Sequence, residues 1–374
     1  MSKVYNFSAG PAVLPESVML KAQKEFVNFN NLGSSVIELS HRSKDYIKVA
    51  DEATENLRSL MNLPDNYKIL FMHGGGRGMF ANVPMNLANP NGCADYIVNG
   101  AWSKYAAEEG VKYTKVNSLQ IDSKNADGKV IIDTKSLNFN KDASYIHSCM
   151  NETIHGIEIF EDLDTGNIPH ISDCSSCILS RPVDVSKYGI IYAGAQKNVG
   201  PSGFCIVIIR EDLIGHALPF TPAISDFKVT YEHDSMFNTP NTFAWYLSGL
   251  VFKWLKDEIG GLSAMEEINK AKASMLYDFI DSSDFYSNNV DVSCRSRMNV
   301  PFFLKNSDLD AEFIAKAKEN NLVGLKGHRV LGGMRASLYN AMTIEGVKAL
   351  VEFMDKFAQE HKTTNWKNCK SQKN

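Results

Sequence analysis

The chain of 374 residues lacks the features that would tie it to a membrane, to nucleic acid or to a secretory route. No apolar run is long enough to span a bilayer, because even the apolar stretch at residues 246–255 is interrupted by Lys253. A net charge of −4 gives no electrostatic reason to expect nucleic acid or an anionic membrane as a partner. The opening residues, MSKVYNFSAGP, do not show the charged-then-apolar pattern of a secretory signal. We therefore expect a cytoplasmic enzyme.

Cysteine is also too scarce and too scattered for a disulfide framework, since the seven cysteines are odd in number. Cys174 and Cys177 form a C-x-x-C pair, but a zinc site needs a second pair of ligands at a similar spacing, and the sequence has none. A redox motif would open a helix, whereas residues 175–179 carry little helix signal. We predict no metal site and interpret the two cysteines as small residues packed behind a strand.

Short runs of β-branched residues alternate with amphipathic segments along most of the chain, which predicts an α/β fold with a mainly parallel sheet flanked by helices. Strands are expected at residues 34–39, 67–72, 95–98, 113–116, 130–133, 143–147, 168–173, 190–192, 204–209, 299–304 and 334–338. Helices are expected at residues 16–30, 44–62 with Ser43 as N-cap, from 79 onward, 242–259 with Asn241 as N-cap, 263–279, 310–320 and 344–361.

Composition and turn signals divide the chain into four parts. Residues 1–16 are expected to form an extended arm, because Gly10-Pro11 and Pro15 punctuate them. Residues 17–260 are predicted to form a large domain that ends at Gly260-Gly261, where Ser263 and Glu266 form a capping box for the next helix. Residues 261–362 then form a smaller C-terminal α/β domain. Residues 363–374 are polar and rich in lysine, so we predict a disordered tail.

Lys197 stands at the end of a predicted core strand. The apolar residues 190–192 are followed by three small residues and then by Gln196 and Lys197. A lysine in that place loses hydration, which disfavours its charged form, and an uncharged amine can form a Schiff base with a carbonyl. The alternative for any single strand-end lysine is that its ammonium extends to solvent. The rest of the chain decides between the two.

A second strand, residues 67–72, runs directly into the glycine-rich sequence HGGGRG at residues 73–78. Strand, glycine-rich turn and helix start form the arrangement in which backbone N–H groups converge on an anion. The loop lacks the lysine and hydroxyl residue of a P-loop, and Met79 stands where a dinucleotide fingerprint needs glycine. The loop therefore indicates a phosphate without naming the molecule, and a merely flexible loop remains the alternative.

Several chemically distinctive residues come just after predicted strands, where ligands gather in α/β sheets. An enzyme that uses pyridoxal phosphate needs a lysine for the aldehyde and a carboxylate for the pyridinium nitrogen. It also needs N–H groups for the phosphate and an aromatic face for the ring. The chain offers candidates for all of these roles: Lys197, Asp173, Gly76, Arg77, Gln196 and Trp102.

The sequence also resembles the phosphoserine aminotransferase family, whose members are class V, fold-type I pyridoxal phosphate enzymes. The resemblance covers nearly the whole chain except residues 118–140, residues 219–232 and the C-terminal tail. The blocks that carry it are FSAGPAVLP, SHRSKDY, FMHGGGRGMFANVP, NETIHG, LSRPVDVSKYGIIYAGAQKNVGPSG, SMFNTPNTFAWYLSGLVFKWL, RSRMNVPF and LKGHRVLGGMRASLYNAM.

The resemblance implies that Lys197 bonds to the cofactor and moves the substrate proton, while Asp173 pairs with the pyridinium nitrogen. It implies that Trp102 stacks on the ring and that Gly76, Arg77, Thr153 and Gln196 hold the cofactor. It further implies a homodimer with shared active sites, in which Asn238 and Thr239 reach the phosphate of the cofactor bound by the other subunit.

The substrates implied by the resemblance are L-glutamate and 3-phosphohydroxypyruvate, which exchange to 2-oxoglutarate and O-phospho-L-serine. The phosphorylated hydroxythreonine of vitamin B6 synthesis is chemically close, and the sequence leaves open whether it is also a substrate. L-Glutamate and 3-phosphohydroxypyruvate both carry an α-carboxylate and a distal anion, and arginine can bind either group through two parallel hydrogen bonds. The family pattern assigns the α-carboxylate to Arg335. It assigns the distal anion to His41, Arg42, His328 and Arg329, partly across the subunit interface.

Two other functions remain open from the sequence. A cysteine desulfurase uses the same lysine chemistry but needs a reactive cysteine on a mobile loop, and Cys294 lies in the corresponding region. That cysteine, however, directly precedes an expected strand. A non-catalytic relative that keeps the fold for binding is the second alternative, and the complete set of candidate catalytic residues argues against it.

Overall fold

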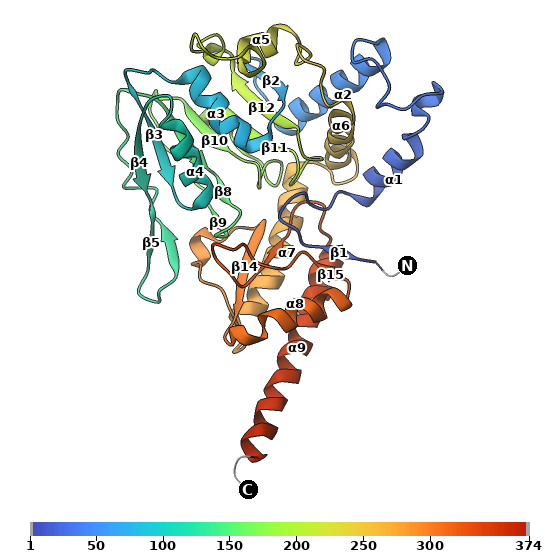
Figure 1. The fold of residues 1–374 in the computed structure, drawn as a ribbon, viewed down its shortest axis with the longest axis vertical. Helices are drawn as coiled ribbons and strands as arrows, with labels where there is room; N and C mark the ends of the chain where they lie inside the picture. Colours follow the sequence, from blue (N-terminus) through green and yellow to red (C-terminus); the bar gives the residue numbers. More distant parts are fainter. Residues whose placement is uncertain (1–2, 372–374) are drawn as a thin grey trace.

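The computed structural model describes residues 3–371, and it describes side chains up to residue 362. Figure 1 shows a larger upper part built around one wide sheet and a smaller lower part, from which the C-terminal helix extends. Among the described residues, no helix is long and apolar enough to cross a membrane.

The upper part is organised by a seven-stranded sheet with the strand order β2-β12-β11-β10-β7-β3-β4. β12 runs in the opposite direction to the other strands of this sheet, which are all parallel to one another. The predicted mainly parallel α/β sheet is therefore confirmed. The strands are β2 (Tyr67–Met72), β3 (Cys93–Val98), β4 (Lys115–Gln120), β7 (Ala143–Cys149), β10 (His170–Asp173), β11 (Ile190–Gly194) and β12 (Cys205–Arg210).

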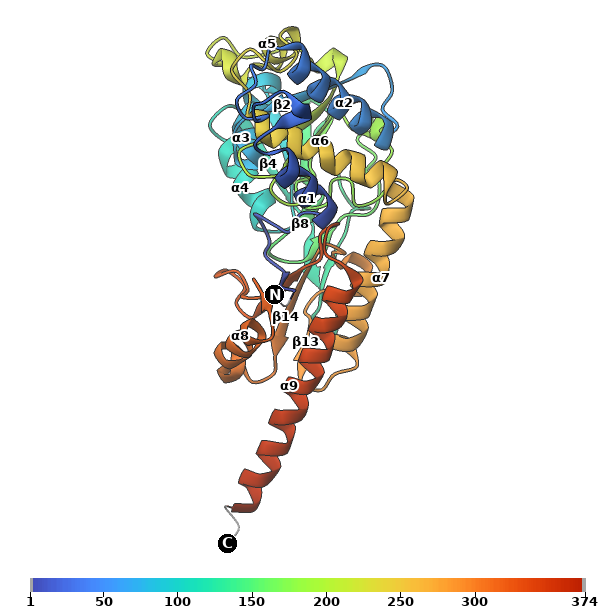
Figure 2. The same ribbon diagram turned by 90° about the vertical axis from the view of Figure 1, so that its right-hand side faces the viewer.

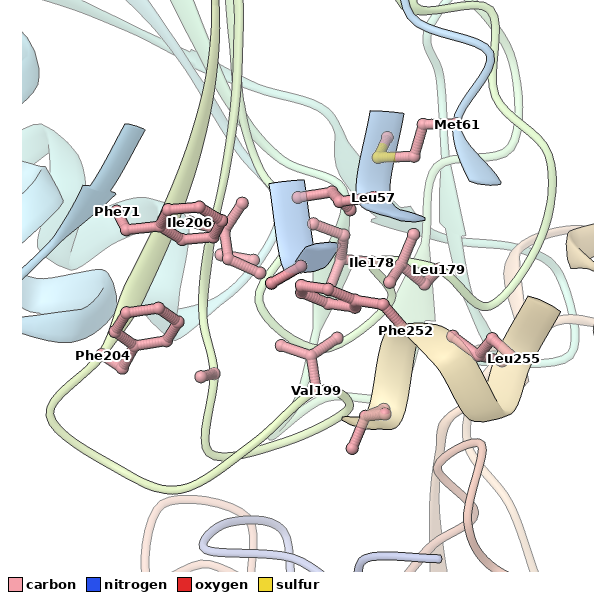
Figure 3. Close-up of a cluster of buried hydrophobic side chains, with 14 of the residues drawn as sticks. Leu57, Met61, Phe71, Ile178, Leu179, Val199, Phe204, Ile206, Phe252 and Leu255 are labelled. Carbon is pink, nitrogen blue, oxygen red and sulfur yellow. The ribbon is translucent and has the colours of Figure 1, made fainter. Parts of the chain in front are cut away.

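Helices cover both faces of this sheet because alternate strand residues point to opposite sides. On one face, Leu70 and Val207 pack with residues of α3, α4 and α5. On the other face, Phe71 and Ile206 pack with residues of α2 and α6, as Figure 3 shows. The helices are α1 (Glu16–Glu25), α2 (Lys44–Leu60), α3 (Gly75–Leu87), α4 (Ala101–Gly110), α5 (Phe227–Glu232) and α6 (Thr242–Asp257).

Two short hairpins extend from the upper part. The first pairs β5 (Asp122–Lys124) with β6 (Val130–Ile132), and the second pairs β8 (Asn151–Glu152) with β9 (Ile157–Glu158). The second hairpin follows directly after β7, and it carries residues of the cavity described below.

The lower part contains a second sheet and a separate apolar core. Its sheet has the order β13-β14-β16, with β13 (Tyr286–Ser287), β14 (Asn299–Leu304) and β16 (Met334–Ser337). Its helices are α7 (Leu262–Asp281), α8 (Asp310–Glu319) and α9 (Ile344–Ser371), of which α7 and α9 lie side by side in Figure 2. The arm joins this part, because β1 (Tyr5–Asn6) pairs with β15 (Leu322–Val323) and Phe7 is buried in its core.

Three expectations about elements were wrong. Residues 34–39 form turns instead of a strand: the Ser35 N–H bonds to the Glu38 carboxylate, and these residues belong to none of the described sheets. The first helix ends at Glu25, before Asn30 and Asn31 take positive φ values. Helix α7 begins at Leu262 after Gly261, so the expected capping box at Ser263 does not form.

Helices α2 and α6 begin as expected, since Ser43 accepts from the Tyr46 N–H and Asn241 accepts from the Ala244 N–H. Helix α3 begins at Gly75, earlier than expected. Helix α9 continues to Ser371, past the expected end at residue 361. The sequence predicts a disordered tail at residues 363–374. The side chains of these residues lie outside the described part, and residues 372–374 lie outside it altogether. The disordered tail therefore stays a prediction.

Candidate active site

A cavity of about 590 Å³ opens at the carboxyl ends of the sheet strands. It is also lined by the arm, through Ala9, Gly10 and Pro11, and by residues of the lower part. Nine residues predicted from the sequence line it: Gly76, Arg77, Trp102, Thr153, Asp173, Gln196, Lys197, His328 and Arg335. The strand ends thus bring together side chains that lie far apart in the sequence, as expected for a parallel sheet.

Lys197 follows β11 and places its amine inside this cavity. Its Nζ donates a hydrogen bond of 2.6 Å to Oγ1 of Thr153 and lies 5.4 Å from the centre of the Trp102 ring. Two hydrogen bonds hold the loop that follows: the Val199 N–H donates to the Ala195 carbonyl, and the side-chain amide of Asn198 donates to the Ile178 carbonyl. These hydrogen bonds therefore hold the backbone next to Lys197 in one conformation.

Asp173 ends β10 and is buried in the floor of the cavity. Burial raises the pKa of its carboxyl, and the nearby Lys197 ammonium acts in the opposite direction. The Ser175 N–H donates to its Oδ1 at 2.8 Å. Ser175 was missed from the sequence, although its place two residues after Asp173 was a signal for it. Its hydroxyl also accepts from the Gly194 N–H at 3.0 Å, which ties β10 to β11.

The N-terminus of α3 forms a cradle of backbone N–H groups beside these residues. Gly74 and Gly75 have φ values of 92° and 60°, which favour glycine, and no side chain caps the helix. A Cβ at Gly76 would lie 3.2 Å from the Ser175 Oγ, and one at Gly194 would lie 3.1 Å from the Gly76 nitrogen. Because an uncapped helix N-terminus favours anions, this cradle fits a phosphate.

Trp102 lies in the first turn of α4 and forms one wall of the cavity. The Arg77 guanidinium lies 5.2 Å from the centre of its ring. Its indole N–H is buried and finds no acceptor among the described residues. The Trp102 ring thus lies beside a cation, and its indole N–H can still donate a hydrogen bond to another molecule.

The opposite wall is cationic. Arg335, on β16, donates from Nη1 to the Thr153 carbonyl at 3.4 Å, and burial lowers the pKa of its guanidinium. The pKa of His328 is lowered by burial and by the nearby charges of Arg335, Arg329 and His155. His155 was not predicted from the sequence. An anion bound beside these groups would offset the repulsion between their charged forms.

Five predicted residues do not line this cavity: His41, Arg42, Asn238, Thr239 and Arg329. Arg42, Asn238, Thr239 and Arg329 are exposed, whereas His41 is half-buried and its Nε2 has no partner among the described residues. The Nδ2 of Asn238 lies 3.2 Å from the His73 Nε2. The chain alone therefore does not bring these five to the cavity.

The cysteines lie elsewhere. Cys294 is 1% exposed, sits in a short helical turn and contacts the Val130 carbonyl, so it lacks the mobile loop of a desulfurase. Cys174 and Cys177 are buried free thiols, as are the other described cysteines. In the described part of the chain, no cluster of three or more His, Cys, Asp or Glu side chains could hold a metal ion.

Comparison with known proteins agrees with this geometry. The aminotransferase class-V family matches residues 4–350. A phosphoserine aminotransferase from Bacillus circulans subsp. alkalophilus is 40% identical, with a TM-score of 0.92 over 96% of this chain and 99% of that one. The pyridoxal phosphate-bound phosphoserine aminotransferase of Trichomonas vaginalis is 41% identical, with a TM-score of 0.88 over 94% of this chain and 100% of that one.

The residues in the cavity fit pyridoxal phosphate. The α3 N-terminus suits its phosphate, and the buried Asp173 suits its ring nitrogen. The unpaired indole N–H of Trp102 is satisfied only by a further polar group. Lys197, which lines the same cavity, has an amine that suits its aldehyde. The desulfurase alternative is disfavoured, and the chain belongs to the aminotransferase class-V family as a pyridoxal phosphate-dependent enzyme close to the phosphoserine aminotransferases.

Proposed function

We propose that the enzyme catalyses reversible transamination between L-glutamate and 3-phosphohydroxypyruvate, giving 2-oxoglutarate and O-phospho-L-serine, in the cytoplasm and as a step of serine biosynthesis. The observation that carries the proposal is the cavity in which Lys197 and Asp173 face Arg335 and His328. An amine and a buried carboxylate suit the cofactor, and the cations beside them suit a substrate with two anionic ends.

Bound pyridoxal phosphate supplies an aldehyde that condenses with amines and a ring that accepts electrons from the substrate carbon. Lys197 would hold the cofactor through its amine, and the same amine would carry the proton taken from the substrate α-carbon. The Thr153 hydroxyl holds the Nζ of Lys197 at 2.6 Å and so restricts the direction from which the amine acts.

Asp173 would pair with the ring nitrogen of the cofactor and would favour its protonated form. A carboxylate buried this deeply is favoured in its charged form only beside a cation, and the protonated ring nitrogen would be one. Trp102 would stack on the ring, while Gly76, Arg77 and Gln196 would hold the cofactor.

Arg335 would bind the α-carboxylate of either substrate, because its buried guanidinium points to the Thr153 carbonyl beside Lys197. His328 and Arg329 would bind the distal carboxylate or phosphate. The low pKa of His328 in the chain without substrate would rise when a phosphate neutralises its cationic neighbours.

The remaining predicted residues would act across a homodimer with shared active sites. His41 and Arg42 follow the exposed Ile37 and precede the exposed Ile47, while Asn238 and Thr239 follow the exposed Phe237. A subunit interface at these segments would cover the three exposed apolar side chains. In this proposal, Asn238 of the partner subunit and Thr239 of the partner subunit reach the cofactor phosphate, and His41 of the partner subunit and Arg42 of the partner subunit reach the distal anion.

Steady-state turnover tests the proposed substrate pair. The purified enzyme with pyridoxal phosphate is given 2-oxoglutarate and O-phospho-L-serine, L-serine, O-phospho-L-threonine or 4-phosphohydroxy-L-threonine, and glutamate is measured. We expect kcat/KM for phosphoserine to exceed that for serine by at least about 10³-fold, because serine leaves the distal cations unpaired. Equal rates with serine, or sulfide release from L-cysteine, would contradict the proposal. The rate with 4-phosphohydroxy-L-threonine decides whether this compound is a second substrate.

A further inference from the structure

The carboxylate of Glu152 is buried at the start of α4, and none of the functions proposed above uses it. Its side chain is 0% exposed. Oε2 accepts from the Trp102 N–H at 3.0 Å, and Oε1 accepts from both the N–H and the hydroxyl of Ser103 at 2.7 Å. All three donors belong to the first turn of α4, which lies about 50 residues earlier in the chain.

Helix α4 needs this carboxylate because it cannot cap itself. Its N-cap residue, Gly100, has no side chain that could accept from the first turn. Gly100 also makes room for the carboxylate, since a Cβ there would lie 2.4 Å from Cδ of Glu152. A charged carboxylate at a helix N-terminus is favoured by the helix dipole and by charge-assisted hydrogen bonds. Glu152 thus caps α4 from another element.

Glu152 is connected to two residues of the candidate active site. On one side it holds the backbone of Trp102, whose ring lines the cavity. On the other side, the next residue in the chain, Thr153, receives the hydrogen bond from Lys197. The side chains of residues 152 and 153 therefore contact both the backbone of Trp102 and the amine of Lys197.

We propose that Glu152 is a positioning residue for the cofactor, and that its carboxylate holds the first turn of α4 so that the Trp102 ring is ordered before pyridoxal phosphate binds. The proposal rests on the proposed stacking of Trp102 against the cofactor. Without the carboxylate, this turn must be ordered during binding, and ordering even one large side chain weakens affinity.

The first test is the affinity of the apoenzyme for pyridoxal phosphate, measured by equilibrium dialysis in the Glu152→Gln variant. Glutamine has the same shape, but it places an amide donor against a backbone N–H and can accept fewer hydrogen bonds. We expect Kd to rise about fivefold to tenfold. We also expect a smaller induced circular dichroism per bound cofactor, because the ring beside it is less ordered.

Glu158→Gln is the matched control. Glu158 lies opposite Asn151 in the same β8–β9 hairpin and is equally buried, but its carboxylate contacts Arg181 and the Arg297 N–H instead of α4. We expect this variant to bind pyridoxal phosphate with the affinity of the wild type. Equal weakening in both variants would assign the effect to the hairpin as a whole and would overturn the proposal, as would unchanged affinity in Glu152→Gln.

A double-mutant cycle tests whether Glu152 acts through Trp102. In a Trp102→Ala background, the added Glu152→Gln change should not weaken binding further, because there is no ring left to order. Full additivity would overturn the positioning role. If Trp102→Ala alone leaves Kd unchanged, the proposed stacking fails, which is a separate result from failure of the Glu152 proposal.

Gly100→Ala keeps the proposal falsifiable if Glu152→Gln does not fold. The added methyl group displaces the carboxylate from α4 without removing it. Ser103→Ala, in contrast, removes the hydroxyl, which donates to Glu152 and accepts from the Asn99 and Gly100 N–H groups, and it leaves both backbone N–H bonds to the carboxylate. We expect Gly100→Ala to weaken cofactor binding at least about fivefold and Ser103→Ala to weaken it less than twofold. The reverse order of these two variants would contradict the proposal.

Discussion

The amine of Lys197 donates a 2.6 Å hydrogen bond to the hydroxyl of Thr153, which comes from a different strand end, 44 residues away in the chain. Lys197 follows β11 and Thr153 follows β7, and β10 with Asp173 lies between these two strands. The two side chains thus meet above the buried carboxylate. This arrangement places an amine, a hydroxyl and a carboxylate in one cavity without any contribution from a partner.

Loss of the Thr153 hydroxyl should slow the reaction more than it weakens the fold. Thr153→Val keeps the shape and removes the acceptor for the Lys197 amine, and we expect kcat to fall about tenfold, the usual effect of one hydrogen bond to a charged group. Thr153→Ser keeps the hydroxyl and should retain most of the activity. Single-turnover rates with phosphoserine measure both, and equal losses in both variants would contradict this role.

Asp173→Asn should reduce kcat by about 10²- to 10³-fold, because it removes the charge that holds a proton on the ring nitrogen. The matched control is Asp95→Asn. Asp95 is also buried, on strand β3 of the same sheet, but its carboxylate accepts from Asn117 and from the Asn140 N–H. We expect this control to lower stability and leave kcat within about threefold. A larger loss of kcat in the Asp95 variant than in the Asp173 variant would contradict the assignment.

His328 should make phosphoserine binding dependent on pH. Burial and neighbouring cations lower its pKa in the free enzyme, and a bound phosphate dianion raises it, so binding takes up a proton. Affinity should therefore fall as pH rises through the window between the free and bound pKa values, by at most about tenfold per pH unit. In His328→Asn this slope should disappear, while the part due to the phosphate's own ionisation remains. Identical pH profiles of KM for the two enzymes would contradict the role.

The arm should contribute to stability through Phe7. This ring is fully buried in the core of the lower part, and the Phe7 N–H and carbonyl bond to Val323 and Ser337. Phe7→Ala should destabilise the protein by about 3–5 kcal/mol, measured as a lower Tm. Val4→Ala, at an exposed position of the same arm, should change stability by less than about 0.5 kcal/mol. Equal Tm values for the two variants would show that the arm is not part of this core.

The sequence predicted correctly that Asp173 and Lys197 lie close together, because a parallel sheet brings the carboxyl ends of its strands to one edge. To predict where Asp173 and Lys197 lie, it was enough to locate β10 and β11 correctly in the sequence. Helix starts at Ser43 and Asn241 were predicted for a similar reason, since a cap depends on residues three apart.

Features that depend on distant residues were not predicted. Residues 34–39 have the pattern of a strand, but a strand also needs a partner strand. These residues form turns instead, in which the Ser35 N–H bonds to the Glu38 carboxylate. Glu152 gave no signal, because a buried carboxylate is recognised only when its donors on α4 are known. His155 was missed for the same reason. The proposed contacts of Asn238 with the cofactor and of Arg42 with the substrate depend on a second chain, which no pattern within one chain describes.

The measurement that tests the central claim most directly is the absorbance spectrum of the enzyme with pyridoxal phosphate, before and after adding O-phospho-L-serine, beside the Lys197→Ala variant. We expect the visible band of the bound cofactor to disappear with phosphoserine and to return with 2-oxoglutarate. The variant should show no such cycle. A band that phosphoserine leaves unchanged, or a Lys197→Ala variant that completes the cycle, would contradict the account.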